Sequence, residues 1–250
     1  MRSSKFRSFD GEELAVHEMG EGRPLVLVHG LFSSAQMNWI KFGHAEKLSK
    51  AGFRVIMPDL RDHGESAKPH NALIYPYGVL NRYLEAVVEH FALEDYDLGG
   101  FSLGARTAAN GVIKGLTPRR LALCGMGLEG LAGWARRSAF FVDAIDRFDE
   151  IKRGDPAFMA KSFMKTMKID REAARLLLGA VDDVKREDLA RITMPTALIC
   201  GQKDQDNGSA KDLALTLADG RYREVPGTHM SSVAEAAMGD ALVSWFGAAE

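Results

Sequence analysis

A serine between two glycines is the feature of this sequence with the clearest chemical meaning. Residues 100–104 read Gly-Phe-Ser-Leu-Gly and match the pattern G-x-S-x-G, with Ser102 at the centre. A strand-like segment precedes the motif and a segment with helical spacing follows it. A sharp strand-to-helix turn presents a serine hydroxyl for attack, and small residues two positions away prevent clashes there. The motif therefore predicts a nucleophile at Ser102; the alternative is a serine that only caps the following helix.

A serine nucleophile needs a general base, and the chain has seven histidines. His229 is the best candidate because it follows the last predicted strand, in the loop Pro-Gly-Thr-His at residues 226–229. From the residues alone, His63 and His70 stay open as alternatives because they also lie in a loop. The remaining histidines are expected to be structural or on the surface: His17, His29, His44 and His90.

A carboxylate must orient the histidine and stabilise its protonated form. Asp204 lies just beyond a predicted strand that ends at Cys200, and Asp206 is the second candidate. The chain order Ser102, Asp204, His229 is the Ser…Asp…His order of one hydrolase fold and differs from the orders of chymotrypsin and subtilisin.

Two backbone N–H groups are expected to form an oxyanion hole. The N–H of Leu103 lies at the predicted start of a helix, where the helix dipole favours negative charge. The second donor is expected from the loop after the strand at residues 24–29, with Leu31 as the candidate because Gly30 lets the backbone turn.

Strands and helices are predicted to alternate along the chain, which favours a mostly parallel sheet of about eight strands with helices on both faces. An Asp-Gly turn at residues 10–11 predicts an N-terminal hairpin. The predicted strands are residues 6–9, 14–17, 24–29, 53–57, 96–101, 121–124, 196–200 and 222–225. The predicted helices are residues 36–51, 77–91, 103–114 and 234–245.

The region from residue 126 to residue 191 interrupts this alternation with helical patterning alone. We predict a core domain of residues 1–125 and 192–250, with residues 126–191 as an all-helical insertion. Its phenylalanine and methionine residues favour a lid over an apolar site, although ordinary packing against the core is the simpler alternative. The predicted pocket residues are Phe32, Phe101, Trp134, Phe141 and Met164.

Taken together, these motifs resemble the α/β-hydrolase superfamily over nearly the whole chain. The resemblance rests on His29-Gly30, Pro-Asp-Leu-Arg-Asp-His-Gly-Glu-Ser at residues 58–66, the serine motif, Gly-Gln-Lys-Asp at residues 201–204, and the histidine loop. It implies an α/β-hydrolase fold without metal or organic cofactor, a structural role for His63, and a helical cap at residues 126–191. The chain departs from the family pattern in lacking a proline shortly after Asp204 and in having Thr228 where glycine commonly precedes the histidine.

Residues 125–130 (Gly-Met-Gly-Leu-Glu-Gly) fit the dinucleotide-binding pattern G-x-G-x-x-G. That pattern belongs at the first strand-to-helix turn of its fold, with an acidic residue about 20 positions further on. Here it falls late, and the candidates Asp149 and Glu150 lie on a predicted helix. A flexible connection to the insertion is therefore the preferred interpretation.

Composition excludes several classes of protein. The 250 residues are 46% hydrophobic and 26% charged, with 32 basic and 34 acidic residues and a net charge of −2. This balance disfavours disorder and gives no basic patch for nucleic acid or an anionic membrane. Cys124 and Cys200 are expected to be buried thiols. Because no signal peptide or long apolar stretch is evident, a cytoplasmic location is expected.

The sequence thus predicts a metal-independent serine hydrolase that cleaves a carboxylic ester or related acyl bond through an acyl-enzyme. The expected partner is a small, apolar acyl substrate. Lactone, thioester and C–C bond hydrolysis remain open. C–C hydrolysis ranks lower because residues 31–34 (Leu-Phe-Ser-Ser) lack the Gly-Pro-Gly run often found in such enzymes of this fold. A hydrolase-fold ligand-binding or receptor protein is the alternative from another class.

Overall fold

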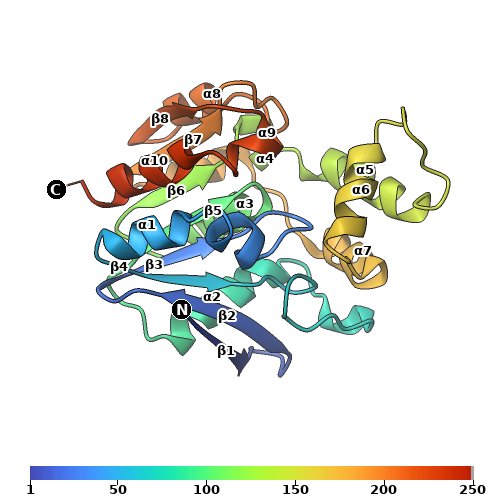
Figure 1. The fold of residues 1–250 in the computed structure, drawn as a ribbon, viewed down its shortest axis with the longest axis horizontal. Helices are drawn as coiled ribbons and strands as arrows, with labels where there is room; N and C mark the ends of the chain where they lie inside the picture. Colours follow the sequence, from blue (N-terminus) through green and yellow to red (C-terminus); the bar gives the residue numbers. More distant parts are fainter. Residues whose placement is uncertain (249–250) are drawn as a thin grey trace.

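A central sheet of eight strands organises the computed structural model, which describes residues 1–248 (Figure 1). The strands lie in the order β1-β2-β4-β3-β5-β6-β7-β8. Their bounds are β1 (Arg2–Arg7), β2 (Glu13–Met19), β3 (Arg23–Val28), β4 (Phe53–Pro58), β5 (Asp97–Phe101), β6 (Leu121–Cys124), β7 (Thr196–Gly201) and β8 (Gly220–Val225). The predicted α/β architecture with about eight strands is confirmed.

The sheet is parallel except at one edge. The hairpin of β1 and β2 is antiparallel, as the Asp-Gly turn predicts, and β2 also pairs antiparallel with β4. Strands β4, β3, β5, β6, β7 and β8 pair in parallel. The inner strands β5 and β6 are buried along their whole length and consist of small and apolar residues, apart from Asp97, which pairs with Arg23 at 2.8 Å.

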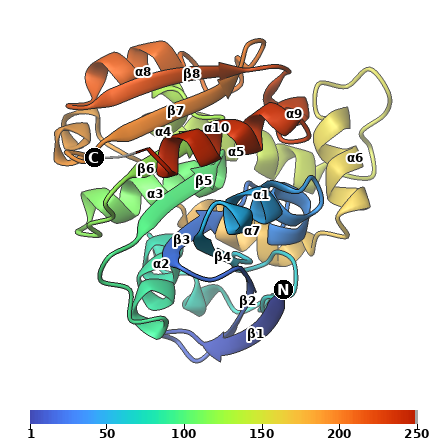
Figure 2. The same ribbon diagram turned by 60° about the vertical axis from the view of Figure 1, so that its left-hand side comes forward.

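Helices cover both faces of the sheet, so each face has its own apolar core (Figure 2). Helices α1 (His44–Lys50) and α10 (Ala236–Phe246) pack on one face, where Leu48, Leu242 and Phe246 are buried. Helices α2 (Val79–His90), α3 (Leu103–Ile113) and α8 (Ala210–Thr216) cover the other face. Within the described residues, no helix combines the length and apolar character needed to cross a bilayer.

The helix predicted for residues 36–51 is wrong as a continuous element. Residues Gln36–Ile40 form a wide turn in which the Lys41 N–H donates to the Gln36 carbonyl, five residues back. Gly43 then adopts a φ of +78° and α1 begins at His44. The break lets the buried Asn38 side chain turn inward, where its Oδ1 accepts the Gly30 N–H at 3.0 Å.

The closing helix predicted for residues 234–245 corresponds to α10, and a separate short helix, α9 (His229–Ser232), precedes it. The short helices η2 (Ala72–Ile74) and η3 (Arg186–Arg191) complete the connections. Asp149 and Glu150 lie beyond a helix end rather than on a helix, so the predicted position of these carboxylates was wrong.

The segment between β6 and β7 is helical, as predicted. It contains α4 (Leu128–Leu131), α5 (Trp134–Asp146), α6 (Phe158–Thr166) and α7 (Arg171–Ala180). Helices α5, α6 and α7 stand together to one side of the sheet (Figure 1). The division into a core domain and an insertion at residues 126–191 stays a prediction.

The parallel strands bring several loops to one edge of the sheet. Val28 pairs with Gly100, Phe101 with Cys124, and Gly201 with Val225, so the loops after β3, β5, β6, β7 and β8 meet there. In open α/β sheets this carboxyl edge is where ligands bind.

Candidate active site

Ser102 occupies a strained turn between β5 and α3. Its φ of +53° lies in the left-handed region that non-glycine residues rarely adopt. The flanking glycines permit this turn because side chains would collide there. A Cβ on Gly100 would lie 2.3 Å from the carbonyl carbon of Gly104, and a Cβ on Gly104 would lie 2.1 Å from the Val28 oxygen. The glycines therefore hold α3 against β3 and β5 and fix the direction of the serine.

The structure brings Ser102, His229 and Asp204 into one hydrogen-bonded chain. The Ser102 hydroxyl donates to Nε2 of His229 at 3.0 Å. The Nδ1–H of His229 donates to Oδ2 of Asp204 at 2.9 Å. The Asp204 side chain is 3% exposed and that of His229 is 8% exposed, so the pair is shielded from water. This is the arrangement that activates a serine in acyl transfer.

Asp206 lies beside this chain and makes no hydrogen bond to His229. Its backbone N–H donates to Oδ1 of Asp204 at 3.1 Å, and its side chain is exposed. Of the two candidate acids, the structure therefore places Asp204 on the histidine. Asn207 stabilises the loop where the family pattern has a proline, because its buried side chain donates to the Gly125 carbonyl at 2.7 Å.

Thr228 has a structural reason to replace glycine before the histidine. Its side chain accepts the Ser231 N–H at 3.3 Å, and its own N–H donates to the Ser231 hydroxyl at 2.8 Å. This reciprocal cap begins α9 with His229 as its first residue. The turn itself is made by Gly227, with a φ of +102°.

Two backbone N–H groups beside Ser102 are available to an oxyanion. Leu103 is the first residue of α3, where an N–H has no partner within the helix. The Leu31 N–H has no hydrogen-bond partner among residues 1–248. Both residues line the same cavity as Ser102. The next N–H along the loop, that of Phe32, donates to His63 instead.

His63 supports the loop that carries Leu31 and Phe32. Its Nε2 accepts the Phe32 N–H at 2.9 Å, and its Nδ1–H donates to the Arg61 carbonyl at 2.7 Å. Complete burial lowers the pKa of His63 to about 3, so the ring is neutral, as the acceptor role requires. The structure thus places His63 outside the candidate catalytic chain.

The remaining histidines also lie outside the hydrogen-bonded series of Ser102, His229 and Asp204. The ring of His29 is buried, donates through Nδ1 to the Gly30 carbonyl and accepts the Leu60 N–H. His70 pairs on the surface with Asp170 and Glu172. His44 binds the Val233 carbonyl, and the His90 ring stacks on Phe6.

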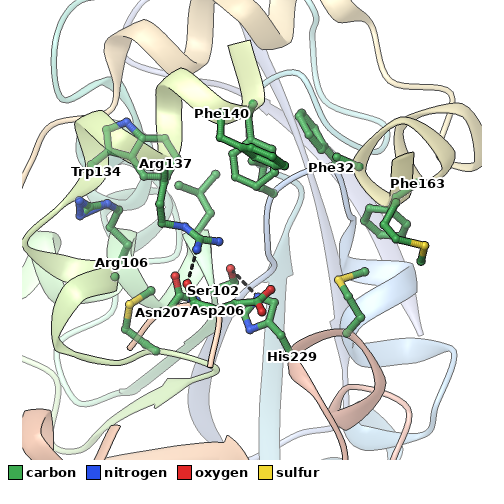
Figure 3. Close-up of a pocket in the computed structure, with 18 of the residues that line it drawn as sticks. Phe32, Ser102, Arg106, Trp134, Arg137, Phe140, Phe163, Asp206, Asn207 and His229 are labelled. Carbon is green, nitrogen blue, oxygen red and sulfur yellow. Dashed lines mark hydrogen bonds between the residues drawn. The ribbon is translucent and has the colours of Figure 1, made fainter. Parts of the chain in front are cut away.

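A cavity of about 610 Å³ opens above Ser102, beneath the helices that follow β6 (Figure 3). Of the five predicted pocket residues, Phe32, Trp134 and Phe141 line it. The prediction was wrong for the other two. The Phe101 ring lies 5.0 Å from that of His229 and packs into the core on the α1 and α10 face. Met164 points into the core and is 1% exposed.

Several cavity residues were absent from the sequence prediction. Arg137 and Phe141 follow Trp134 at three and seven positions, so all three share one stripe of α5 and face the cavity. A cation on an otherwise apolar stripe was the signal that could have identified Arg137. Phe140, Met159, Phe163 and Met230 also contribute apolar surface.

The glycines of residues 125–130 have a packing role, which replaces the flexible connection predicted for them. A Cβ on Gly127 would lie 2.2 Å from the Gly208 oxygen, and one on Gly130 would lie 2.6 Å from Cβ of Asn207. These glycines let α4 contact the loop that follows Asp204.

In the part of the chain that the structure describes, no group of three or more His, Cys, Asp or Glu residues is placed to hold a metal ion.

Comparison with known proteins agrees with this architecture. The sequence profile described as the alpha/beta hydrolase fold matches residues 23–121. The AB hydrolase superfamily protein YisY of Bacillus subtilis (strain 168) is 26% identical over 215 residues, which are 77% of this chain and 78% of that protein. The chain thus has the α/β-hydrolase fold, and its sequence is similar to members of that superfamily.

Solved structures show the same fold. An esterase from Exiguobacterium antarcticum superposes with a TM-score of 0.77 at 20% identity, over 98% of this chain and 99% of that one. The enol-lactonase from Burkholderia xenovorans LB400 superposes with a TM-score of 0.75 at 23% identity, over 97% of this chain and 99% of that one. At these identities the likeness concerns the fold alone.

Proposed function

We propose that this protein is a serine hydrolase that cleaves a carboxylic ester or a related acyl bond. The observation that carries the proposal is the hydrogen-bonded chain from Ser102 through His229 to Asp204 in the wall of a cavity. Free serine is a weak nucleophile, and a histidine held in this tautomer is the base that activates it.

The reaction follows from the positions of these groups. His229 takes the hydroxyl proton as Ser102 attacks the substrate carbonyl. The N–H groups of Leu31 and Leu103 receive the negative charge that develops on the carbonyl oxygen. His229 then protonates the leaving group, which departs and leaves an acyl-serine. Water, deprotonated by His229, attacks this ester and releases the acid.

In this proposal the helices of residues 126–191 act as a cap that supplies one wall of the cavity. Trp134, Phe140, Phe141 and Phe163 come from this segment and line the cavity together with Phe32. Such walls exclude water and bind an apolar part of a substrate. The substrate is a small acyl compound.

A lactone is the second candidate for the scissile bond, since a neighbour in fold is an enol-lactonase and others are esterases. Ring opening uses the same attack by Ser102, with the leaving oxygen tethered to the acyl group. The competing class is a hydrolase-fold receptor in which the cavity only binds a ligand.

A fluorophosphonate probe tests the proposal without knowledge of the substrate. Intact mass is measured after treatment of the wild type and of the Ser102→Ala variant. One adduct on the wild type and none on the variant is the expected result, and esters and lactones would then be compared as substrates. A folded wild type that takes no adduct would favour the receptor.

A further inference from the structure

Arg137 reaches from the helical segment toward the candidate catalytic groups. Figure 3 shows it extending from α5 toward Asp206, on the side of the cavity where Ser102 and His229 lie. Arg137, Ser102 and His229 line the same cavity. Arg106 and Arg136 also contribute to the cavity wall, and the rest of the wall is largely apolar.

The two fully buried arginines among the described residues have carboxylate partners. Arg61 pairs with Asp10 at 2.6 Å, and Arg106 pairs with Asp183 at 2.7 Å. Arg137 is half-buried and forms no ion pair with any residue between 1 and 248, and its hydrogen bond goes to the backbone carbonyl of Asp206. A guanidinium group has five N–H donors, so this hydrogen bond leaves most donors of Arg137 without a partner among the described residues.

The surroundings of Arg137 favour a negatively charged ligand. Burial lowers the pKa of Arg137, while the charges of Asp206 and Asp204 act in the opposite direction. A cation removed from water without a paired anion is costly, and an anion in the cavity relieves that cost. The planar guanidinium also matches a carboxylate in shape and can bind both oxygens.

A purely structural role is the alternative, since the Asp206 contact joins α5 to the loop that carries Asp204. That contact uses one neutral carbonyl, which a smaller or uncharged donor could equally satisfy. A second contact, in which the guanidinium lies 5.8 Å from the centre of the Phe141 ring, uses the charge but no N–H donor, so the remaining donors have no partner among residues 1–248.

We propose that Arg137 binds a carboxylate group of the substrate. The substrate class is then an ester or lactone with an apolar body and one carboxylate, the body lying against Phe32 and Phe141. This inference rests on the proposed hydrolase function. The exposed carboxylate of Asp206 lies at the same cavity and competes for Arg137 when no substrate is bound.

Matched pairs of esters test this assignment. The first pair is mono-4-nitrophenyl glutarate and its neutral methyl ester, which differ in charge on the acyl side. The second pair is 4-(butyryloxy)benzoate and its methyl ester, which differ in charge on the leaving group. For each pair, kcat and KM are measured for the wild type, Arg137→Gln, Arg136→Gln and Asp206→Asn.

The wild type is expected to prefer the charged member of at least one pair by about 10-fold or more in kcat/KM. Arg137→Gln is expected to reduce this preference by about 10- to 100-fold, chiefly through KM, with a much smaller effect on the neutral ester. Arg136 also lines the cavity but is exposed, so Arg136→Gln removes a solvated charge from the same helix and should leave the preference within about twofold. Asp206→Asn removes the competing charge and should increase the preference.

Three outcomes would overturn the assignment: no preference in either pair, an equal loss on charged and neutral esters in Arg137→Gln, or an equal loss of preference in Arg136→Gln. The second of these would indicate the structural contact, and the third a general attraction between charges. Failure of the hydrolase function is distinct, because the wild type would then take no fluorophosphonate and cleave none of the four esters.

Discussion

The backbone N–H of Asp206 donates to Oδ1 of Asp204, while Oδ2 of the same carboxylate accepts from His229. The two oxygens of Asp204 thus have separate tasks, one fixing the carboxylate and the other orienting the imidazole. Asp206 contributes through its main chain, which a change of side chain leaves in place.

Asp204→Asn is expected to lower kcat for ester hydrolysis by about 1,000- to 10,000-fold, because an amide opposite Nδ1 favours the wrong tautomer of His229. Asp206→Asn keeps the supporting N–H and should lose far less on a neutral ester. Steady-state kinetics with 4-nitrophenyl butyrate compares the two variants. Equal losses would mean that Asp206 shares the role of the acid.

His63→Leu is expected to lower kcat by about 10- to 100-fold with a smaller change in KM. The variant leaves the Phe32 N–H without its acceptor, so the loop that carries the Leu31 donor can shift. His70→Gln is the matched control, because His70 is exposed in the same long loop and does not line the cavity. An unchanged kcat in a folded His63→Leu variant would show that the loop keeps its position without His63.

Two glycine-to-alanine changes in helices should have opposite effects on the free energy of unfolding. Gly104→Ala places a methyl group 2.1 Å from the Val28 oxygen and should destabilise the protein by about 1–3 kcal/mol or more. Gly179, near the end of α7, is exposed and has no atom within 4 Å of the place that an alanine methyl would take, so alanine there should stabilise by about 0.5–1 kcal/mol. Urea unfolding measures both. A stable Gly104→Ala variant would contradict the close contact of α3 with β3.

Asp62→Asn is expected to stabilise the protein at pH 8 and to have little effect at pH 4. Burial raises the pKa of Asp62 from 3.8 to about 7, and its Oδ2 has no hydrogen-bond partner among the described residues. Below pH 3.8 the carboxyl is protonated in both the native and unfolded states. As the pH rises to about 7, only the unfolded state releases the proton freely, so the native state loses stability, by up to about 4 kcal/mol.

Asparagine avoids this loss because it has no proton to release. Its side-chain oxygen can still accept the Tyr75 hydroxyl, which now donates to Oδ1 of Asp62 at 2.6 Å. Asparagine also tolerates the φ of +69° at this position. Urea unfolding at pH 4, 6 and 8 measures the difference between variant and wild type. A difference that does not grow with pH would contradict the raised pKa.

The strands and the hydrogen-bonded residues Ser102, His229 and Asp204 could be predicted from the sequence because their signals are local. Buried parallel strands have continuous apolar runs, and the turn at Ser102 requires glycines at fixed positions, so both are visible in a few adjacent residues. The choice between Asp204 and Asp206 could not be made in this way, since both follow β7 at a suitable distance.

The missed features depend on contacts between distant segments. The interruption before α1 allows the Gly30 N–H to donate to the Asn38 side chain. The spacing of apolar residues does not reveal this hydrogen bond. Phe101 and Met164 were misplaced because an apolar residue near a site can face either the cavity or the core. The proposed role of Arg137 depends on how α5 is positioned over the sheet, which its sequence does not specify.

Arg106, one helical turn after Ser102, joins the two ends of the helical segment. Its guanidinium donates to the Leu131 carbonyl at 2.6 Å, near the start of that segment, and to Asp183 at 2.7 Å, near its end. The side chain also lies 5.0 Å from the Trp134 ring. For protein engineering, a segment grafted between β6 and β7 would therefore have to present a carbonyl and a carboxylate to Arg106.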